Sequence, residues 1–270
     1  MAVEIVLVGC GNMGYAMLAG WLTSGRLKLG EVVVVEPSEA LRARAEQLGA
    51  TTVADASAID ANVAPRLVIF AVKPQVILDI VPAYARFAPD ATFLSVAAGT
   101  PIAAFETALG EGARVVRCMP NTPAAIGKGM MVVVANAHTD EPTMEFIREL
   151  LSASGAVATI ADEKLMDAVT AVSGSGPAYV FHFIECLTAA GETAGLPKDT
   201  AKLLAMQTVF GAASLAAESD EDPGELRRQV TSPNGTTAAA LSVLMDDDRL
   251  KTLVGEAVEA ARMRSVELGK

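Results

Sequence analysis

Short apolar runs alternate with longer helical patterns over the first 160 residues. The runs are rich in β-branched residues and show little polar alternation, which is typical of buried parallel strands. They predict strands at 3–8, 32–35, 67–72, 92–96, 114–119 and 130–135. Stretches between them, such as 13–23, 38–48 and 75–87, predict helices. Strands that are apolar on both faces and separated by helices indicate βαβ units, and hence a doubly wound sheet.

The pattern changes near residue 160, because from residue 163 onward no run predicts a strand. Long alanine-rich helical patterns follow, broken at 173–177, 195–197, 221–224 and 232–235 by segments containing glycine or proline. The fold class is therefore α/β. We predict an N-terminal sheet domain over 1–161 and an all-helical C-terminal domain over 162–270.

The predicted C-terminal helices carry many apolar positions, for example at 179–187 and 203–215. Two interpretations are open. The positions could form the core of a self-contained helical bundle, or part of the apolar surface could be buried against a second copy of the chain. The amount of apolar helix surface in so small a domain favours oligomerisation.

Charge and hydropathy exclude several classes of function. The chain has 21 Lys+Arg against 32 Asp+Glu, a net charge of −11, and so lacks the basic surface that nucleic-acid binding needs. No apolar run approaches the ~18–20 residues of a membrane-spanning helix. The N-terminal run contains Glu4 and lacks the features of a signal peptide, so we interpret it as the first strand.

Cysteine and histidine are scarce and scattered. The three cysteines are Cys10, Cys118 and Cys186, and the two histidines are His138 and His182. Their number and spacing do not predict a zinc site or a disulfide framework. The sequence therefore predicts no metal and a reducing compartment, by default the cytoplasm.

A glycine motif follows the first predicted strand. Gly9, Gly11 and Gly14 match G-x-G-x-x-G between a strand and a helix. The first glycine permits a tight turn, the second lets a pyrophosphate approach the backbone, and the third lets helix and strand pack closely. Because strand, helix and next strand are all in place, a dinucleotide site is favoured over a merely tight turn. The segment predicted to bind cofactor is Gly9, Cys10, Gly11, Asn12, Met13 and Gly14.

Glu36 ends the second predicted strand, about twenty residues beyond the motif, where a carboxylate can accept the ribose hydroxyls. This favours NAD and repels the 2′-phosphate of NADP. Ser38, Arg42 and Arg44 lie just beyond, and an arginine turned towards the ribose could accommodate that phosphate. Both arginines could equally belong to a solvated helix face. The choice between NADPH and NADH stays open.

Two later strand ends, AVKPQ and VAAGT, should border the cofactor, because ligands bind at the carboxyl ends of strands in such sheets. The residues predicted to do so are Ala71, Val72, Lys73, Pro74, Ala97, Ala98 and Gly99. Lys73 could be a catalytic acid, or merely the lysine before a helix that Pro74 begins. In RCMPNTPA, two prolines bracket Asn121 and Thr122. This rigid loop either positions a substrate or forms a structural corner.

Two loops of the helical region lead into predicted helices: VSGSGPAY at 172–179 and VTSPNGTTAAAL at 230–241. Helix N-termini with free N–H and hydroxyl donors can bind a small carboxylate. Ordinary helix capping is the alternative for each loop. Two such loops in a chain with a dinucleotide motif favour substrate binding.

With GCGNMG, AVKPQ, RCMPNTPA, VSGSGPAY and VTSPNGTT in this order, the chain resembles the pyrroline-5-carboxylate reductase family over residues 3–268. That family carries out the last step of proline biosynthesis. The resemblance implies a Rossmann-like domain, then a helical dimerisation domain, with dimers usually assembled into larger rings. It also implies NADPH or NADH as hydride donor and no metal.

The resemblance further implies a substrate loop that can come from the partner subunit. The Thr237 hydroxyl would lie at the ring nitrogen as the catalytic residue, and Asp220 would lie near the site. The residues implied to bind substrate are Ser175, Gly176, Ser232, Pro233, Asn234, Gly235, Thr236 and Thr237. Two residues depart from the family pattern: Asn234 replaces a glycine, and Cys118 replaces an aliphatic residue. Asparagine tolerates a left-handed backbone, so the loop can keep its shape.

The chemistry is consistent with this sparse set of acids and bases, since a protonated cyclic imine is already electrophilic and mainly needs a well-placed hydride. A related β-hydroxyacid or imine reductase is one rival. It would carry a lysine with an asparagine one turn later, a pattern that Lys164 and Lys202 do not show. The other rival is a non-catalytic dinucleotide sensor or scaffold, which would have no use for VTSPNGTT.

Overall fold

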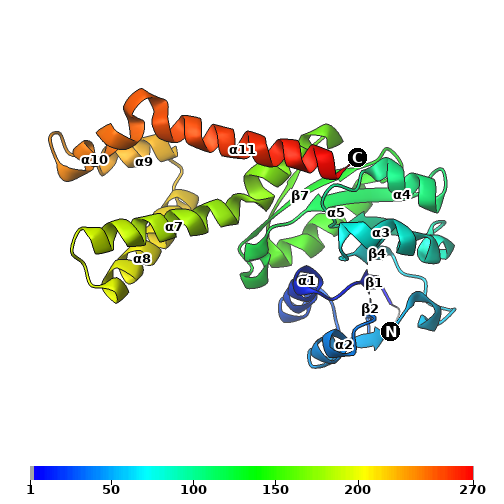
Figure 1. The fold of residues 1–270 in the computed structure, drawn as a ribbon. Coiled ribbons are helices and arrows are strands. Elements are labelled where there is room, and N and C mark those ends of the chain that lie inside the picture. Colours follow the sequence, from blue (N-terminus) through cyan, green and yellow to red (C-terminus); the bar gives the residue numbers. More distant parts are fainter. Residues whose placement is uncertain (1–2, 270) are drawn as a thin grey trace. The chain divides into compact units, whose positions relative to one another are not determined.

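The structure is a computed structural model that describes residues 3–269 of the chain (Figure 1). The chain divides into two compact units. The first comprises Met1–Ser175 and Ala261–Lys270, and the second comprises Gly176–Ala260.

The first unit contains one eight-stranded sheet with the strand order β3-β2-β1-β4-β5-β6-β7-β8. Its strands are β1 Ile5–Val8, β2 Val32–Val35, β3 Thr51–Val53, β4 Leu67–Phe70, β5 Thr92–Ser95, β6 Arg114–Met119, β7 Gly129–Ala135 and β8 Gly155–Thr159. All neighbouring strands are parallel except β6 and β7. After β3 the chain returns to the far side of β1 to form β4, which creates a topological switch point between β1 and β4. The predicted Rossmann-like doubly wound sheet is confirmed.

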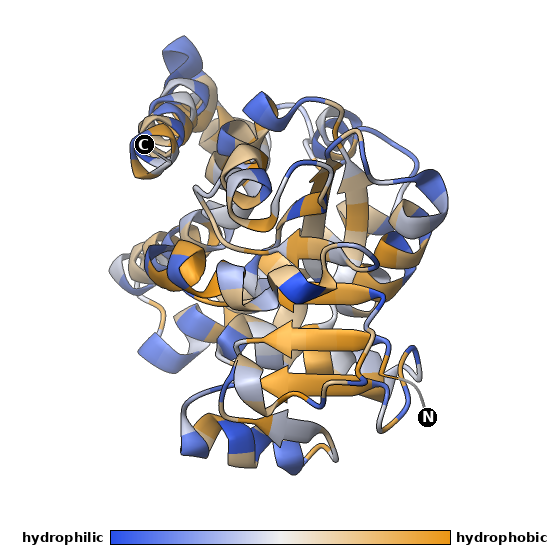
Figure 2. Ribbon diagram, turned by 90° about the vertical axis from the view of Figure 1, so that its right-hand side faces the viewer, coloured by the Kyte–Doolittle hydropathy of each residue, from blue (hydrophilic) through white to orange (hydrophobic). Residues whose placement is uncertain are grey.

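Helices cover this sheet, and apolar side chains alternate between its two faces. The helices are α1 Asn12–Thr23, α2 Glu39–Glu46, α3 Pro74–Ile80, α4 Ile102–Leu109, α5 Glu141–Leu151 and α6 Met166–Val169. Ile5 and Leu7 belong to one buried cluster with Trp21, while Val6 and Val8 belong to the other. Successive side chains of a strand point to opposite faces, and both faces are covered here, so β1, β2 and β4 are apolar at every position; Figure 2 shows strands of the sheet in orange.

The structure differs from the sequence prediction at several element bounds. The strands predicted at 3–8 and 67–72 are shorter, Ile5–Val8 and Leu67–Phe70, while β3 and β8 were not predicted. β6 and β7 are antiparallel and joined by a short 3-10 segment instead of a helical crossover. The helix predicted at 75–87 ends as α3 and continues as a 3-10 helix from Val81, because Pro82 has no N–H to donate.

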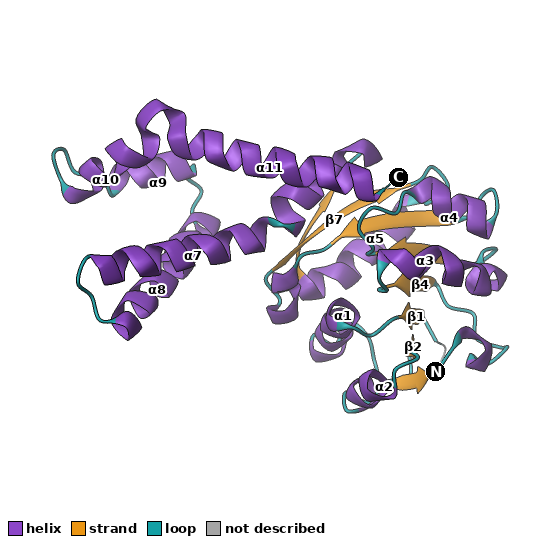
Figure 3. Ribbon diagram, viewed as in Figure 1, coloured by secondary structure: helices purple, strands orange, loops and turns teal. Residues whose placement is uncertain are grey.

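The second unit is built from helices, as predicted (Figure 3). These are α7 Gly176–Thr193, α8 Lys198–Glu218, α9 Pro223–Gln229 and α10 Thr236–Met245, together with the first part of α11 Arg249–Leu268. A Cβ on Gly191 would lie 3.2 Å from Cβ of Ala201, so α7 and α8 pack closely there. Among its helices only Ala201 and Ala205 are buried in this single chain. Within residues 3–269, no helix combines the length and the apolar character that a bilayer-spanning segment requires.

Candidate cofactor and substrate site

The turn from β1 to α1 requires its glycines. Gly9 has a φ of +90°, and a Cβ on it would lie 2.7 Å from the carbonyl oxygen of Ala71. A Cβ on Gly14 would lie 2.2 Å from the Gly9 carbonyl oxygen. A Cβ on Gly11, in contrast, would meet nothing within 4 Å. The turn therefore packs tightly at Gly9 and Gly14 and leaves space beside Gly11. A pyrophosphate can approach the backbone only where such space exists.

The N-terminus of α1 continues this open surface. Gly11 is the N-cap residue, and its lack of a side chain leaves the first-turn N–H groups of this 12-residue helix without a side-chain cap. Asn12 and Met13 occupy the first turn and line a small cavity of about 350 Å³ with Arg44 and Thr122. A helix N-terminus of this kind is suited to bind phosphate. Within the predicted segment, Gly11, Asn12 and Met13 are accessible, whereas Gly9, Cys10 and Gly14 are buried.

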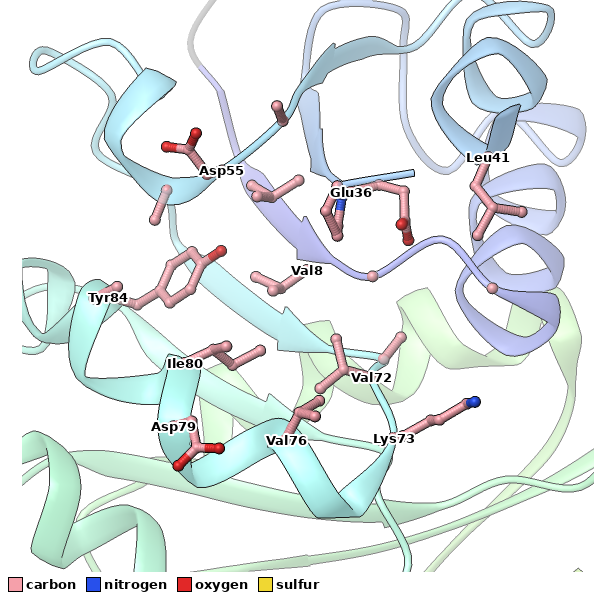
Figure 4. Close-up of a pocket in the computed structure, with 18 residues that line it drawn as sticks. Val8, Glu36, Leu41, Asp55, Val72, Lys73, Val76, Asp79, Ile80 and Tyr84 are labelled. Atoms are coloured by element: carbon pink, nitrogen blue, oxygen red, sulfur yellow. The ribbon is translucent and has the colours of Figure 1, made fainter. Parts of the chain in front are cut away.

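A larger cavity of about 640 Å³ lies at the carboxyl ends of β1, β2 and β4 (Figure 4). This is the switch point of the sheet, where ligands bind in folds of this class. Of the residues predicted to bind cofactor, those that line it are Gly9, Gly11, Glu36, Ala71, Val72 and Lys73. Most other lining side chains are apolar, including Leu41 and Ile80. The shape and lining fit the adenosine portion of a dinucleotide.

Glu36 is buried, with 7 % of its surface exposed, and its carboxylate binds the glycine turn. The Cys10 N–H donates to Oε2 at 2.8 Å, and the Ser38 N–H donates to Oε1 at 2.9 Å. Glu36 thereby joins the turn after β1 to the end of β2. Burial, and secondly the Glu36 charge, raise the pKa of the Cys10 thiol to about 11, so this thiol stays neutral at physiological pH.

The two arginines beyond Glu36 have partners outside the cavity. Arg42 donates from Nη1 to the carbonyl oxygens of Glu36 at 2.7 Å and Pro37 at 2.8 Å. The Arg44 guanidinium lies 3.5 Å from the centre of the Tyr15 ring. The large cavity is lined by neither side chain.

The other strand-end segments differ in their relation to the cavity. Lys73 is the N-cap residue of α3 and lines the cavity, and Pro74 is the first residue of that helix. Ala97, Ala98 and Gly99 follow β5 but are not among the cavity-lining residues. A Cβ on Gly99, whose φ is +80°, would lie 3.3 Å from the carbonyl oxygen of Leu268 at the end of α11.

Asn121 has a clearer role than the sequence predicted. Its Nδ2 donates to the carbonyl oxygen of Ser173 at 3.2 Å and to the Ser173 Oγ at 3.4 Å. Its Oδ1 accepts from the Met130 N–H at 2.8 Å. The loop after β6 is therefore a corner that holds the π-helical turn Thr170–Gly174 just before Ser175. Isolated π-helical turns are frequent at functional sites.

A second link of this kind, between Arg117 and Glu163, was not predicted from the sequence. Arg117 on β6 pairs with Glu163 at 3.0 Å, and Glu163 also accepts from the Ile102 N–H at 2.9 Å. The pair joins β6, the start of α4 and the segment leading into α6. The residues lie 46 positions apart, and no local spacing pattern indicates such a contact.

The predicted substrate loop lies between α9 and α10 in the second unit. Asn234 has a φ of +57°, the left-handed conformation expected of a residue that replaces glycine. Gly235 donates its N–H to the Ser232 carbonyl oxygen at 3.0 Å and is the N-cap of α10, with Thr236 as first helical residue. Thr237 is half-buried in the first turn. Ser175 ends the first unit and Gly176 begins α7, so Gly176 and 232–237 belong to a different unit from the cofactor residues.

Two family models match the chain. Residues 4–99 match a model described as NADP oxidoreductase, coenzyme F420-dependent, and residues 163–268 match one described as pyrroline-5-carboxylate reductase dimerisation. Within residues 3–269 no group of three or more His, Cys, Asp or Glu side chains is arranged to hold a metal ion.

Relatives and solved structures agree with these models. The pyrroline-5-carboxylate reductase of Pseudomonas aeruginosa is 40 % identical over 268 residues, covering 99 % of this chain and 97 % of that protein. The enzyme of Escherichia coli is 34 % identical over the full length of both chains. The solved structure of a pyrroline-5-carboxylate reductase from Coxiella burnetii covers both chains completely with a TM-score of 0.93 at 33 % identity. That of Plasmodium falciparum, with NADP bound, has a TM-score of 0.85 at 28 % identity and covers 99 % and 98 % of the two chains. By sequence and by fold over its whole length, this chain belongs to the pyrroline-5-carboxylate reductase family.

Proposed function

We propose that this chain reduces L-1-pyrroline-5-carboxylate to L-proline with NADH or NADPH as hydride donor. The observation that carries the proposal is that one chain contains both a cavity suited to a dinucleotide and a loop suited to a small carboxylate. The first unit has an apolar cavity beside an open glycine turn, and the second has a hydroxyl-rich helix N-terminus at 232–237. Membership of the family supports the same activity.

In this proposal the cofactor, when bound, supplies a hydride and the chain's residues supply position. Gly11 and the first turn of α1 hold the pyrophosphate, while Ala71–Pro74 and Ala97–Gly99 flank the ribose and nicotinamide. The backbone N–H groups at the start of α10 bind the substrate carboxylate, helped by the hydroxyls of Ser232 and Thr236.

Thr237 orients the ring nitrogen of the protonated imine. The C=N carbon accepts the hydride and its electron pair, the C=N double bond becomes single, and the nitrogen keeps its proton as the amine of proline. Placing the two reacting atoms close and in line contributes several kcal/mol of the barrier reduction, so a dedicated acid is not needed.

The helical unit is proposed to make the protein a homo-oligomer. Residues 163–268 match a dimerisation model, and the helices of the second unit expose large apolar side chains, including Leu203 and Phe210 at 67 % and 65 %. We extend this to rings of dimers, with the 232–237 loop completing the cofactor site of the partner subunit. We also retain a functional boundary at 161/162, close to where the dimerisation match begins, and a cytoplasmic location, consistent with three free cysteines.

The test is an assay of purified protein with L-1-pyrroline-5-carboxylate and each reduced dinucleotide, following nicotinamide absorbance and proline formation. Imine-dependent oxidation with proline as product is expected. Thr237→Val should lower kcat/KM about a hundredfold, as loss of one positioned hydrogen-bond donor does, while Thr237→Ser should keep most of it. Unchanged kinetics in Thr237→Val would refute its role.

Co-expression of two inactive variants tests the shared site. Gly11→Asp has room for its side chain but places a carboxylate where the phosphates bind, and Thr237→Val disables the substrate loop. If the loop serves the partner subunit, half the dimers are mixed and one of their two sites is intact. About a quarter of wild-type activity should then return. No recovery would place both halves of the site in one subunit.

A further inference from the structure

The end of the large cavity formed by β2 is acidic. Three carboxylates line the cavity, those of Glu36, Asp55 and Asp79, against one ammonium group, that of Lys73. Figure 4 shows Glu36 at the end of β2, and Asp55 follows the neighbouring strand β3, whereas Asp79 belongs to α3 and Lys73 to the turn before it. The Asp55 carboxylate accepts hydrogen bonds from Ser57, which lower the pKa of Asp55 and keep it ionised. Any anionic group that enters this end meets fixed negative charge.

Three donor groups at this end are already engaged: the N–H groups of Cys10 and Ser38, and Nη1 of Arg42. The N–H groups of Cys10 and Ser38 both donate to Glu36, at 2.8 and 2.9 Å. Arg42 donates from Nη1 to the carbonyl oxygens of Glu36 and Pro37. A phosphate is recognised by N–H donors and guanidinium groups, and here those groups have acceptors within the protein.

Glu36 itself retains capacity to accept. A carboxylate offers about four lone-pair positions, and two backbone N–H groups use two of them. The remaining positions fit the two ribose hydroxyls of NADH, which are donors. A 2′-phosphate offers acceptors in place of one donor and brings a charge of roughly −1.5 to −2 next to a buried carboxylate. That repulsion is strong because the cavity is largely apolar.

We propose that this chain prefers NADH to NADPH, and that Glu36 is the residue that determines the preference. The inference rests on the proposed function, because it assumes that the cavity holds the adenosine end of the cofactor. Asp55 adds negative charge at the β3 side of this end, and neither Arg42 nor Arg44 lines the cavity to offset it.

The first test measures binding alone, by titration calorimetry of the full-length protein with ADP-ribose and with 2′-phospho-ADP-ribose. ADP-ribose should bind at least about tenfold more tightly, a difference of about 1.4 kcal/mol. The ratio should shrink as salt is raised, since the partly open charges are screened. Equal affinity, or tighter binding of the phosphorylated ligand, would overturn the inference while leaving the reductase assignment intact. Binding of neither ligand would overturn both.

Variants then locate the preference. Glu36→Ser removes the carboxylate and frees the N–H groups of Cys10 and Ser38. The ratio of the affinity for ADP-ribose to the affinity for 2′-phospho-ADP-ribose should therefore fall at least about tenfold. Glu39→Gln is the matched control, because Glu39 is an exposed carboxylate at the start of α2 that does not line the cavity, and its ratio should not change. Asp55→Asn leaves the hydrogen bonds of Glu36 in place and should narrow the ratio two- to threefold, which keeps the test valid if Glu36→Ser loosens the turn. An unchanged ratio in both Glu36→Ser and Asp55→Asn would refute the assignment.

Discussion

The two units of this chain differ in how many of their apolar side chains they bury. In the first unit every residue of β1, β2, β4 and β5 is buried, and two clusters on the two faces of the sheet form its core. In the second unit two alanines are the only buried residues, while phenylalanines and leucines of α7 and α8 are exposed in the single chain.

This difference separates two sources of stability. The first unit gains it from contacts within one chain, and the cavity proposed to bind the cofactor is lined by residues of this unit alone. The second unit leaves apolar surface uncovered, and such surface marks a protein interface. The loop 232–237, which is proposed to bind substrate, lies on this second unit. Catalysis should therefore depend on assembly, whereas dinucleotide binding should not.

One substitution made in both units gives the largest expected effect. Phe93 is fully buried, and Phe93→Ala should lower the free energy of unfolding by about 3–5 kcal/mol. Phe210 is 65 % exposed, and Phe210→Ala should change the stability of the subunit by less than about 0.5 kcal/mol. It should instead weaken self-association about tenfold or more. Urea unfolding measures the stability of the subunit, and sedimentation measures self-association. Equal losses of stability in the two variants would contradict the difference between the units.

Charge placed on the exposed surface of α8 should separate binding from catalysis. The double variant Leu203→Asp with Phe210→Asp should be monomeric and lose about a hundredfold or more in turnover, because carboxylates would have to be desolvated in the interface. Its affinity for ADP-ribose should stay within about threefold of wild type, since the cavity is formed by residues of the first unit alone and both substitutions lie in the second.

Leu78→Asp on α3 is the matched control for that variant, since Leu78 is 46 % exposed but lies in the first unit. It should remain oligomeric and active. Monomers with full turnover in the α8 double variant would contradict the account.

The Asn121 link should give a smaller effect inside the first unit. Asn121→Ala leaves the Met130 N–H and Ser173 groups without their partner, and should cost about 1–3 kcal/mol of unfolding free energy. Because the link holds the turn before Ser175, KM for the imine should rise while ADP-ribose affinity stays unchanged. Asn121→Asp keeps the acceptor for Met130 and loses only the donor to Ser173, so its loss should be smaller. Equal effects of both variants would show that the Ser173 side of the link dominates.

The smallest effect concerns the buried thiols. Burial raises the pKa of Cys118 to about 12, and burial with the Glu36 charge raises that of Cys10 to about 11. Above the ordinary thiol pKa the unfolded chain loses protons that the folded chain keeps, so stability should fall as pH rises from about 9 towards 11. Urea midpoints across that range measure the fall. Cys118→Ala should reduce its slope, and a slope identical to wild type would refute the contribution of Cys118.

The sequence predicted the elements whose signals are local. Six strands, the all-helical region, the glycine turn and the first residues of α10 all follow from patterns within about ten residues of each position, whereas the left-handed Asn234 was expected from the family resemblance. The edge strand β3 has only three residues, and β8 is rich in alanine, so neither carries a strong strand signal. The antiparallel β6–β7 pair depends on a turn whose geometry rests on Asn121.

Contacts between residues far apart in the sequence could not be predicted from it. The Arg117–Glu163 pair, the Asn121–Ser173 link and the bonds of Glu36 to the turn exist because the sheet brings strand ends together. The sequence left the roles of Arg42 and Arg44 open for a different reason, since their partners are backbone carbonyl groups and an aromatic ring, which no pattern of residue types indicates. Residue types indicated where the cofactor site lies, but their hydrogen-bond partners were needed to describe it.

The most direct test of the account is sedimentation of the wild-type protein over a wide concentration range, with specific activity and ADP-ribose affinity measured on the same samples. The account predicts that specific activity falls in proportion to the monomer fraction, while ADP-ribose affinity stays constant throughout. A monomer that retains full specific activity would contradict it.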